Sequence, residues 1–322
     1  MKKYLIIDIG GTKTTAVIFN NRGETITDFK VKKSRTYEGE EVVFQNTIEL
    51  IYEVLEEAQI TKKDICGVGV AAPGLLDYRT GLIIDVPMMG WKNFPLGDRL
   101  REEFGVPVYV ENDGNLGALA ETHVGVAQGE NTVLYQTIST GCGGGIVIEG
   151  KIYHGRNGFA GEFGHVSINF AGPKCGCGGS GCFELYASGS AINSRMKRDI
   201  KSGIKSMAFD SIGYDPEKVN GKILGDAAEK GDPYAISMLQ QEGYYIGVGL
   251  ANLINLFDPD VIVLAGGMVK TDKYFWYTMM NEICRHTCFP FDEDRIRISK
   301  LNDKVVAYGA YFMVKDALDG EM

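Results

Sequence analysis

The chain has 322 residues, of which 44% are hydrophobic, and it carries a formal net charge of -9. This length and apolar content suffice for a large buried core and predict two domains. The acidic balance, without a block of basic residues, disfavours a nucleic-acid partner. No apolar run reaches the roughly 18 residues of a membrane span, and the opening YLIIDIG is too short for the apolar region of a signal peptide. We therefore expect a cytoplasmic protein with neither a membrane nor a nucleic-acid partner.

Seven cysteines are present, and three of them, Cys175, Cys177 and Cys182, lie within GHVSINFAGPKCGCGGSGCFE at 164–184. In a reducing compartment an odd set of cysteines is poorly explained by disulfides, and clustered thiols are more often metal ligands. The glycines of this stretch also match the dinucleotide pattern GxGxxG at 176–181. No predicted strand precedes that pattern and no strand-helix-strand unit surrounds it, so we do not interpret it as a nucleotide site.

The N-terminal part predicts three strands, at 4–10, 14–20 and 25–31, arranged as a β-meander. Apolar residues then recur at helical spacing between 42 and 59, which predicts an amphipathic helix. The apolar segment CGVGVAAPG at 66–74 predicts a strand that ends in a Pro-Gly turn. Strands followed by a helix and a further strand are typical of an α/β domain.

A strand at 106–113 and a helix at 115–124 follow, and from Thr132 the sequence returns to strands around a glycine run. This repetition predicts two similar α/β domains. The later part is mainly helical and includes a helix at 233–257, before an apolar strand at 261–267.

The last predicted helix, at 305–318, is expected to pack back on the first domain. We therefore predict a first domain of residues 1–113 plus 305–322 and a second domain of residues 114–304.

The turn DIGGTKTT places Asp8 at the end of an apolar strand, before Gly10, Gly11, Thr12 and Lys13. Backbone amides of such a turn can approach a phosphate without hindrance, the hydroxyls can add donors, and Asp8 can hold a hydrated Mg²⁺. A tight hairpin turn with solvated polar residues explains the same pattern.

Two further glycine turns follow apolar strands, STGCGGG at 139–145 with Thr140 and Gly141, and the diglycine Gly266-Gly267. The first lets a ligand come close to the backbone, or else marks a strained bulge between two strands. The second can let a flat base approach the end of a strand. A Walker motif GxxxxGK[ST] is absent from the sequence, which disfavours a P-loop NTPase.

Asp113 lies where a predicted strand ends and a helix begins, in VENDGNLGALAE. An aspartate at this place is a good helix N-cap, which is a purely structural role. A carboxylate at the mouth of a cleft is also what a kinase needs to accept a hydroxyl proton during phosphoryl transfer. Both interpretations stay open from the residues alone.

Glu162 and His165 lie close together among glycines, and Glu184 follows the last clustered cysteine. Carboxylates and an imidazole can hydrogen-bond several hydroxyls, as the recognition of a polyol requires. Taken singly, each is more often a surface residue or a satisfied polar group.

The spacing H-x9-C-x-C-x4-C provides one imidazole and three thiolates, a full tetrahedral set for Zn²⁺ with no position for water. The four ligands are His165, Cys175, Cys177 and Cys182. Such a site is structural, and it can orient His165 so that its other ring nitrogen, with Glu162, faces a substrate. The remaining thiols Cys66, Cys284 and Cys288 are better explained by packing.

These motifs together resemble the ROK family, bacterial sugar kinases and related repressors of the actin-like ATPase superfamily. The motifs that carry the resemblance are DIGGTKTT, STGCGGG, VENDGNLGALAE, GEFGH and CGCGGSGCFE, the last two being highly specific in tandem. The resemblance covers nearly the whole chain. It implies an α/β chain with the two-domain actin-like ATPase (ribonuclease H-like) fold and an interdomain cleft.

The resemblance also implies a role for each matching residue. It makes Asp113 the general base, and it makes Gly74, Asn112, Glu162, His165 and Glu184 the contacts of the sugar. It assigns the ATP phosphates to Gly10, Gly11, Thr12, Thr140 and Gly141, and the adenosine side to Gly266 and Gly267. The family's zinc ligands match His165, Cys175, Cys177 and Cys182.

The expected activity is therefore ATP- and Mg²⁺-dependent phosphorylation of the 6-hydroxyl of an aldohexose by a zinc-containing, homodimeric enzyme. Glucose is the first candidate, and N-acetylmannosamine and N-acetylglucosamine are the alternatives. Met88 replaces the asparagine of the glucokinase-type NLGW, Ser139 replaces a usual glycine, and the loop between His165 and Cys175 is short. A sugar-responsive repressor is disfavoured, because it needs a helix-turn-helix ahead of DIGGT. A chaperone-type ATPase is also disfavoured, because it does not need the GEFGH and cysteine segments.

Overall fold

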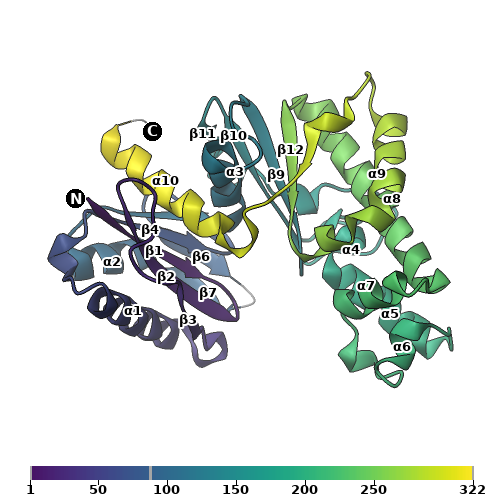
Figure 1. Ribbon diagram of the computed structural model, residues 1–322, viewed down its shortest axis with the longest axis horizontal. Coiled ribbons are helices and arrows are strands. Elements are labelled where there is room, and N and C mark those ends of the chain that lie inside the picture. Colours follow the sequence, from purple (N-terminus) through teal and green to yellow (C-terminus); the bar gives the residue numbers. More distant parts are fainter. Residues whose placement is uncertain (1, 87–88, 321–322) are drawn as a thin grey trace. The chain divides into compact units, whose positions relative to one another are not determined.

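The computed structural model describes residues 2–86 and 89–320, and the chain forms two compact units (Figure 1). The first unit comprises Met1–Asn131, Gly145–Gly161 and Lys300–Met322, and the second comprises Thr132–Gly144 and Glu162–Ser299. These bounds differ from the predicted domains, which stay a prediction. The helix that begins at Asp113 explains most of the difference, because it packs against the C-terminal helix inside the first unit.

The first sheet has five strands in the order β3-β2-β1-β4-β8. Their bounds are β1 (Lys3–Ile9), β2 (Lys13–Asn20), β3 (Lys30–Lys33), β4 (Gly67–Ala72) and β8 (Val108–Asn112). β1, β4 and β8 are parallel, whereas β2 is antiparallel to both of its neighbours. The predicted strand at 25–31 is wrong in its bounds, because Thr25 forms only an isolated bridge and the Thr27 hydroxyl, rather than a backbone carbonyl, accepts the Ile18 amide.

Helices cover both faces of this sheet (Figure 1). They are α1 (Glu40–Glu57), α2 (Leu96–Phe104), α3 (Asp113–Val124) and α10 (Val305–Asp319). Leu5 and Ile7 of β1 belong to the core shared with α1 and α2, while Tyr4 on the opposite face contacts the ring of Tyr311 of α10. A Cβ on Gly69 would lie 2.5 Å from the carbonyl oxygen of Ala310. This close approach confirms the prediction that the last helix packs back on the N-terminal elements.

The second sheet has the order β11-β10-β9-β12-β13, with bounds β9 (Thr132–Ile138), β10 (Cys142–Ile148), β11 (Lys151–Ile152), β12 (Val261–Ala265) and β13 (Ile296–Ile298). β12 pairs in parallel with both β9 and β13. Both sheets thus place their third, second, first, fourth and fifth strands side by side, as the repeated sequence pattern predicts. A small third sheet, β5-β6-β7, has the bounds β5 (Leu75–Asp77), β6 (Leu82–Val86) and β7 (Trp91–Phe94).

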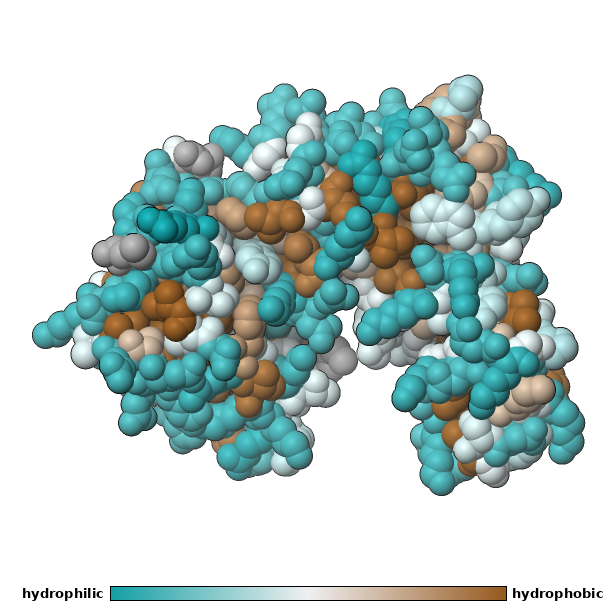
Figure 2. Space-filling view, in the orientation of Figure 1, coloured by the Kyte–Doolittle hydropathy of each residue, from teal (hydrophilic) through white to brown (hydrophobic). Residues whose placement is uncertain are grey.

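The second unit is otherwise helical, with α4 (Glu184–Ala187), α5 (Gly189–Lys201), α6 (Met207–Asp210), α7 (Gly221–Glu229), α8 (Pro233–Phe257) and α9 (Asp272–His286). α8 has the predicted bounds, because Asp232 caps its first turn and Pro233 occupies the first helical position. Among the described helices none is long and apolar enough to cross a membrane. Hydrophilic side chains cover most of the face shown in Figure 2.

Candidate active site

Residues from three separate motifs share the carboxyl edge of the first sheet. β1, β4 and β8 are neighbouring parallel strands in register, so they end at the same edge. Asp8 is the penultimate residue of β1, Gly74 follows β4 by two residues, and Asn112 ends β8 immediately before Asp113. Open α/β sheets bind their ligands at this edge. The structure therefore brings together, within one unit, residues that are more than 100 positions apart in the chain.

The carboxyl groups of Asp8 and Asp113 influence each other at this edge. Burial raises the pKa of Asp8 to about 6, with a further increase from the negative charge of Asp113 and an opposing effect of Lys13. The pKa of Asp113 is also raised, because surrounding protein disfavours the charged form although the residue still contacts solvent. Two carboxylates that repel each other are a suitable donor set for a divalent cation with oxygen ligands, such as Mg²⁺.

Asn112, and not Asp113, caps helix α3. The Asn112 side-chain oxygen accepts the amide of Gly114 at 2.8 Å, while Asp113 is already the first helical residue. Asp113 Oδ1 accepts the same amide at 2.9 Å. The capping role that the sequence allows for Asp113 is therefore carried by its neighbour, and Asp113 is an exposed residue at the edge of the sheet.

The turn after β1 is closed and anchored by hydrogen bonds to its backbone carbonyls. The amide of Gly10 donates to the carbonyl of Lys13 at 2.9 Å, which closes the turn. The Ser34 hydroxyl donates to the carbonyl of Gly10 at 2.6 Å, and the Thr36 hydroxyl donates to that of Gly11 at 3.1 Å. Gly11, Thr12 and Lys13 are exposed. An exposed turn with anchored carbonyls, rich in glycine and carrying a threonine and a lysine, has the composition of an anion site.

Gly74 has a structural reason to be glycine. Its φ of +81° lies in the left-handed region, and a Cβ would approach the carbonyl oxygen of Asp85 to 2.6 Å. Its predicted sugar contact stays a prediction. Met88, where the sequence departs from the glucokinase-type motif, lies outside the described residues.

The second unit repeats this arrangement at the carboxyl edge of the second sheet. β9 and β12 are parallel, with Thr137 opposite Ala265, so the turns that contain Thr140–Gly141 and Gly266–Gly267 lie at one edge. A cavity of about 670 Å³ opens there. Its described lining includes Thr140, Asn193, Lys222, Gly267, Lys270 and Thr271, but neither Gly141 nor Gly266. A volume of this size, with two lysines and several polar groups, fits a nucleotide with its phosphates.

Ser139 occupies the place where the family resemblance suggests glycine. Its φ is outside the left-handed region that glycine favours, so a side chain is tolerated there. The carbonyl of Ser139 accepts the amide of Gly189 at 2.7 Å, and the carbonyl of Thr140 accepts that of Ser190 at 3.1 Å. The loop is thereby anchored to the first turn of α5.

Three of the sequence motifs meet around Cys142. The amide of Cys142 donates to Glu184 Oε2 at 2.9 Å, and a Cβ on Gly141 would lie 2.5 Å from the same oxygen. A Cβ on Gly164 would approach the carbonyl oxygen of Cys142 to 2.2 Å. Close packing against the backbone therefore requires glycine at position 164, whereas a side chain at position 141 would displace the Glu184 carboxylate. The predicted sugar ligand Glu184 directly contacts the loop after β9.

His165, Cys175, Cys177 and Cys182 form a compact cluster, with all four ligand atoms within 4.8 Å of one another. His165 Nδ1 lies 3.7 Å from Cys175 Sγ, and Cys177 Sγ lies 3.6 Å from Cys182 Sγ. These separations match the edge of roughly 3.8 Å that a tetrahedron with Zn–S bonds of about 2.3 Å requires. All seven cysteines are free, and the sulfur distance is far longer than the ~2.05 Å of a disulfide.

The electrostatics of the cluster also favour a cation. The amide of Gly179 lowers the pKa of Cys177, and the neighbouring thiols lower it further. Burial raises the pKa of Cys182 to about 12, and the charges of the other two thiols add to this. Three thiols this close cannot all ionise without a positive charge between them. The donor set of three thiolates and one imidazole fits Zn²⁺. With Nδ1 of His165 turned to the cluster, its Nε2 is the nitrogen available to a substrate.

The ROK family model matches residues 4–317 of the chain. The chain belongs to the ROK family. It is 33% identical to a glucokinase of Halalkalibacterium halodurans, over 97% of this chain and 94% of that protein. It is 30% identical to a xylose repressor of Caldicellulosiruptor bescii, over 96% of this chain and 77% of that protein. A solved ROK family glucokinase from Streptomyces griseus, in complex with glucose and AMPPNP, matches with a TM-score of 0.83 and 28% identity, covering 98% of this chain and 99% of that chain.

Membership of the ROK family confirms the resemblance derived from the motifs, together with the α/β class and the actin-like ATPase fold. The family includes both enzymes and repressors among the relatives of this chain. Sequence similarity at this level therefore establishes the scaffold and leaves the activity to the site residues.

The sequence analysis missed two contacts between a buried carboxyl group and a basic side chain. Glu111 Oε2 lies 2.6 Å from His154 Nε2, and Arg195 Nη2 donates to Glu242 Oε2 at 2.6 Å. Glu242 is fully buried, and its pKa is raised to about 8 by burial, against the effect of Arg195. Glu111 and Glu242 each lie among apolar residues of a predicted strand or helix. This pattern could have indicated a buried carboxyl group that needs a partner.

Proposed function

We propose that this ROK protein is an ATP-dependent sugar kinase that transfers the γ-phosphoryl group of ATP to the 6-hydroxyl of an aldohexose, with glucose as the preferred sugar. The observation that carries the proposal is Asp113, an exposed residue that lies at a ligand-binding sheet edge while Asn112 performs the capping. A repressor needs no general base at this position. The glucokinase of Halalkalibacterium halodurans, 33% identical over 97% of this chain, supports the same activity.

Asp113 is the general base of the proposed reaction. Its carboxylate accepts the proton of the sugar 6-hydroxyl, while that oxygen forms a bond to the γ-phosphorus and the bond to the β-phosphate oxygen breaks, releasing ADP. The raised pKa of Asp113 suits this task, because a stronger base accepts the hydroxyl proton more readily. The proton is retained on Asp113 until solvent removes it.

ATP is proposed to occupy the cavity of the second unit, with Gly266–Gly267 on the adenosine side. Thr140 and Gly141 contact its phosphates, as do Gly10, Gly11, Thr12 and Lys13 from the turn after β1. Asp8 is the residue that would hold Mg²⁺ through its water shell. When bound, Mg²⁺ neutralises charge that develops on the phosphate oxygens during the transfer.

Sugar hydroxyls are proposed to bind Glu162, His165 and Glu184 from the second unit, with Gly74 and Asn112 from the first. Zn²⁺ held by His165, Cys175, Cys177 and Cys182 has a structural role, because all four positions are filled by protein ligands. It would orient His165 toward the sugar. N-acetylmannosamine and N-acetylglucosamine remain the alternative substrates, since none of the proposed sugar contacts is assigned to the substituent at position 2 of the ring.

The test is ADP release by the purified protein with Mg²⁺-ATP and one sugar at a time, from glucose, the two N-acetylhexosamines and xylose. We expect release only with a hexose, fastest with glucose, and a product that carries its phosphate on oxygen 6. Rapid release with an N-acetylhexosamine and slow release with glucose would move the assignment to a hexosamine kinase. Calorimetric sugar binding without ADP release would instead support a sugar-responsive regulator, the second class among its relatives.

A further inference from the structure

We infer that Glu111 and His154 are positioning residues for Asp113, and that they tie the N-terminus of α3 to the hairpin that follows Gly74. This inference rests on the proposed role of Asp113 as the general base. All of the residues that carry it belong to the first unit.

Glu111 holds one residue on each side of Asp113, through the backbone amide of Asn112 and the side chain of Asn115. Its side chain is buried, with 2% of the residue exposed. Glu111 Oε1 accepts the amide of Asn112 at 2.8 Å and the side-chain NH₂ of Asn115 at 3.0 Å. One carboxylate oxygen therefore fixes the residue before Asp113 and another residue in the first turn of α3. Asp113 lies between these two anchor points in the chain.

His154 holds Glu111 from the opposite side. Its Nε2 lies 2.6 Å from Glu111 Oε2. Its ring stacks on Tyr78, with 3.6 Å between the ring centroids and 4° between the planes. Tyr78 directly follows β5, the strand that begins after Gly74. The Arg79 guanidinium lies 4.8 Å from the centre of the Tyr78 ring. A continuous line of contacts thus connects the Gly74 hairpin, through His154 and Glu111, to the backbone around Asp113.

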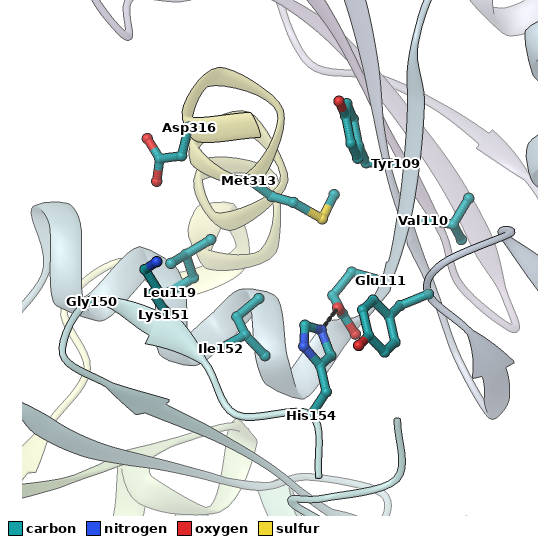
Figure 3. A pocket seen from close by; sticks show the side chains of 11 residues that line it. Tyr109, Val110, Glu111, Leu119, Gly150, Lys151, Ile152, His154, Met313 and Asp316 are labelled. Atoms are coloured by element: carbon teal, nitrogen blue, oxygen red, sulfur yellow. Dashed lines mark hydrogen bonds and ion pairs between the residues drawn. The ribbon is translucent and has the colours of Figure 1, made fainter. Parts of the chain in front are cut away.

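A cavity of about 270 Å³ borders this pair (Figure 3). Figure 3 shows Glu111 and His154 facing each other at one end, with Met313 of α10 reaching into the middle. Its walls also include Tyr109, Leu119 and Ile152. Because empty space adjoins the pair, close packing does not hold the His154 ring in place. The hydrogen bond to Glu111 and the stack on Tyr78 must do so.

Loss of the His154 hydrogen bond leaves Glu111 Oε2 buried without a partner. Such a carboxylate either turns toward water or stays strained, and both outcomes weaken its hold on Asn112 and Asn115. A shift of the base by about 1 Å can cost roughly 100-fold in rate. Sugar binding should change less than kcat, because neither Glu111 nor His154 is a proposed sugar ligand, and Glu111 holds the proposed sugar contact Asn112 only through its backbone amide.

The same unit contains a matched control at the other end of α3. His123 Nε2 lies 3.1 Å from Asp316 Oδ2, and its ring stacks on Phe312 with centroids 4.2 Å apart and 8° between the planes. This trio also combines an imidazole, a carboxylate and an aromatic ring, although His123 Nε2 makes no hydrogen bond of good geometry to Asp316. It joins the last turn of α3 to α10 and makes no contact with the first turn of the helix among the recorded interactions of the described residues.

The experiment compares His154→Phe with His123→Phe, each of which keeps an aromatic ring for stacking and removes the nitrogen. For His154→Phe we expect kcat to fall about 10- to 100-fold with hexose KM within about threefold of the wild type. For His123→Phe we expect kcat within about twofold at a similar loss of thermal stability. His154→Gln, whose amide can still donate to Glu111, should recover most of the lost kcat. Equal kcat in the two phenylalanine variants, or no recovery in His154→Gln, would overturn the inference.

Amide hydrogen exchange provides a readout that does not depend on turnover. Peptides that cover Asn112 to Asn115 should exchange faster in His154→Phe than in the wild type, and at the wild-type rate in His123→Phe. Unchanged exchange in His154→Phe would overturn the positioning role even if the kinase activity is established. Absence of ADP release by the wild-type protein with every sugar would contradict the proposed function alone.

Discussion

Replacing Asp113 with asparagine tests the proposed chemistry while leaving the local structure in place. Asn112 supplies the helix cap through its side-chain oxygen at 2.8 Å from the Gly114 amide, and this contact is untouched. The amide oxygen of the new side chain can also accept the Gly114 amide in place of Asp113 Oδ1. The change therefore removes a negative charge and a proton acceptor, and little else.

The expected size of the effect follows from these contacts. Removal of a general base costs about 10²- to 10⁴-fold in kcat, which is roughly 3–5 kcal/mol of transition-state stabilisation. Stability should not fall, because the Asp113 charge contributes to the rise of the Asp8 pKa from 3.8 to about 6. That rise corresponds to about 3 kcal/mol in total, most of it from burial. We therefore expect an unchanged or slightly higher Tm.

The assay is coupled ADP release with Mg²⁺-ATP and saturating hexose, together with thermal unfolding of the same preparations. Asp98→Asn is the control, since Asp98 is an exposed aspartate of α2 that pairs only with Arg101 among the contacts recorded for it. It should keep full activity. A kcat of Asp113→Asn within about tenfold of the wild type would refute the assignment of Asp113 as the base. A large loss of both kcat and Tm would show that the residue acts structurally instead.

The remaining predictions concern the carboxylate pair, the second glycine loop and the zinc site. A raised folded-state pKa means that ionisation of Asp8 opposes folding. The stability that the protonated Asp8 carboxyl allows is fully present below about pH 3.8 and is lost as the pH rises through about 6. Without Mg²⁺, Asp8→Asn should thus exceed the wild type in unfolding free energy at pH 7.5 and equal it near pH 3.5, although it abolishes turnover; equal stability at pH 7.5 argues against the buried charge. Gly141→Ala should raise hexose KM about tenfold, because the new methyl group displaces Glu184 Oε2. Gly143→Ala is the control and should leave hexose KM unchanged, since its methyl group meets only that of Thr137 at 3.2 Å. Equal KM values in the two variants would contradict the Glu184 contact. Cys177→Ser should lose the bound zinc, measured by elemental analysis, and should lower Tm. Cys284→Ser, at an exposed cysteine outside the cluster, should change neither quantity. A wild-type protein purified without metal would contradict the zinc site.

The first glycine turn and the cysteine cluster show how far sequence reasoning reaches. DIGGTKTT combines a strand, a turn and a second strand within one short segment, so local preferences decide its structure, and β1 and β2 form as expected. The zinc set is equally local, because all four ligands lie within 18 consecutive residues, from 165 to 182. By contrast, the strand expected at 25–31 was wrong in its bounds, since the Thr27 side chain took the place of a backbone partner.

By itself the sequence determined the family and the order of the elements, and it predicted the residues with catalytic chemistry, because each motif is a contiguous pattern whose spacing reflects local geometry. The tertiary structure alone decided that Asn112 caps α3 in place of Asp113, that Glu184 contacts Cys142, and that Glu111 is paired with His154. The last two contacts join residues 42 and 43 positions apart, and the choice of cap depends on where β8 ends in its sheet. Pairings of this kind arise only when parallel strands align and helices pack on them, so no local preference encodes them.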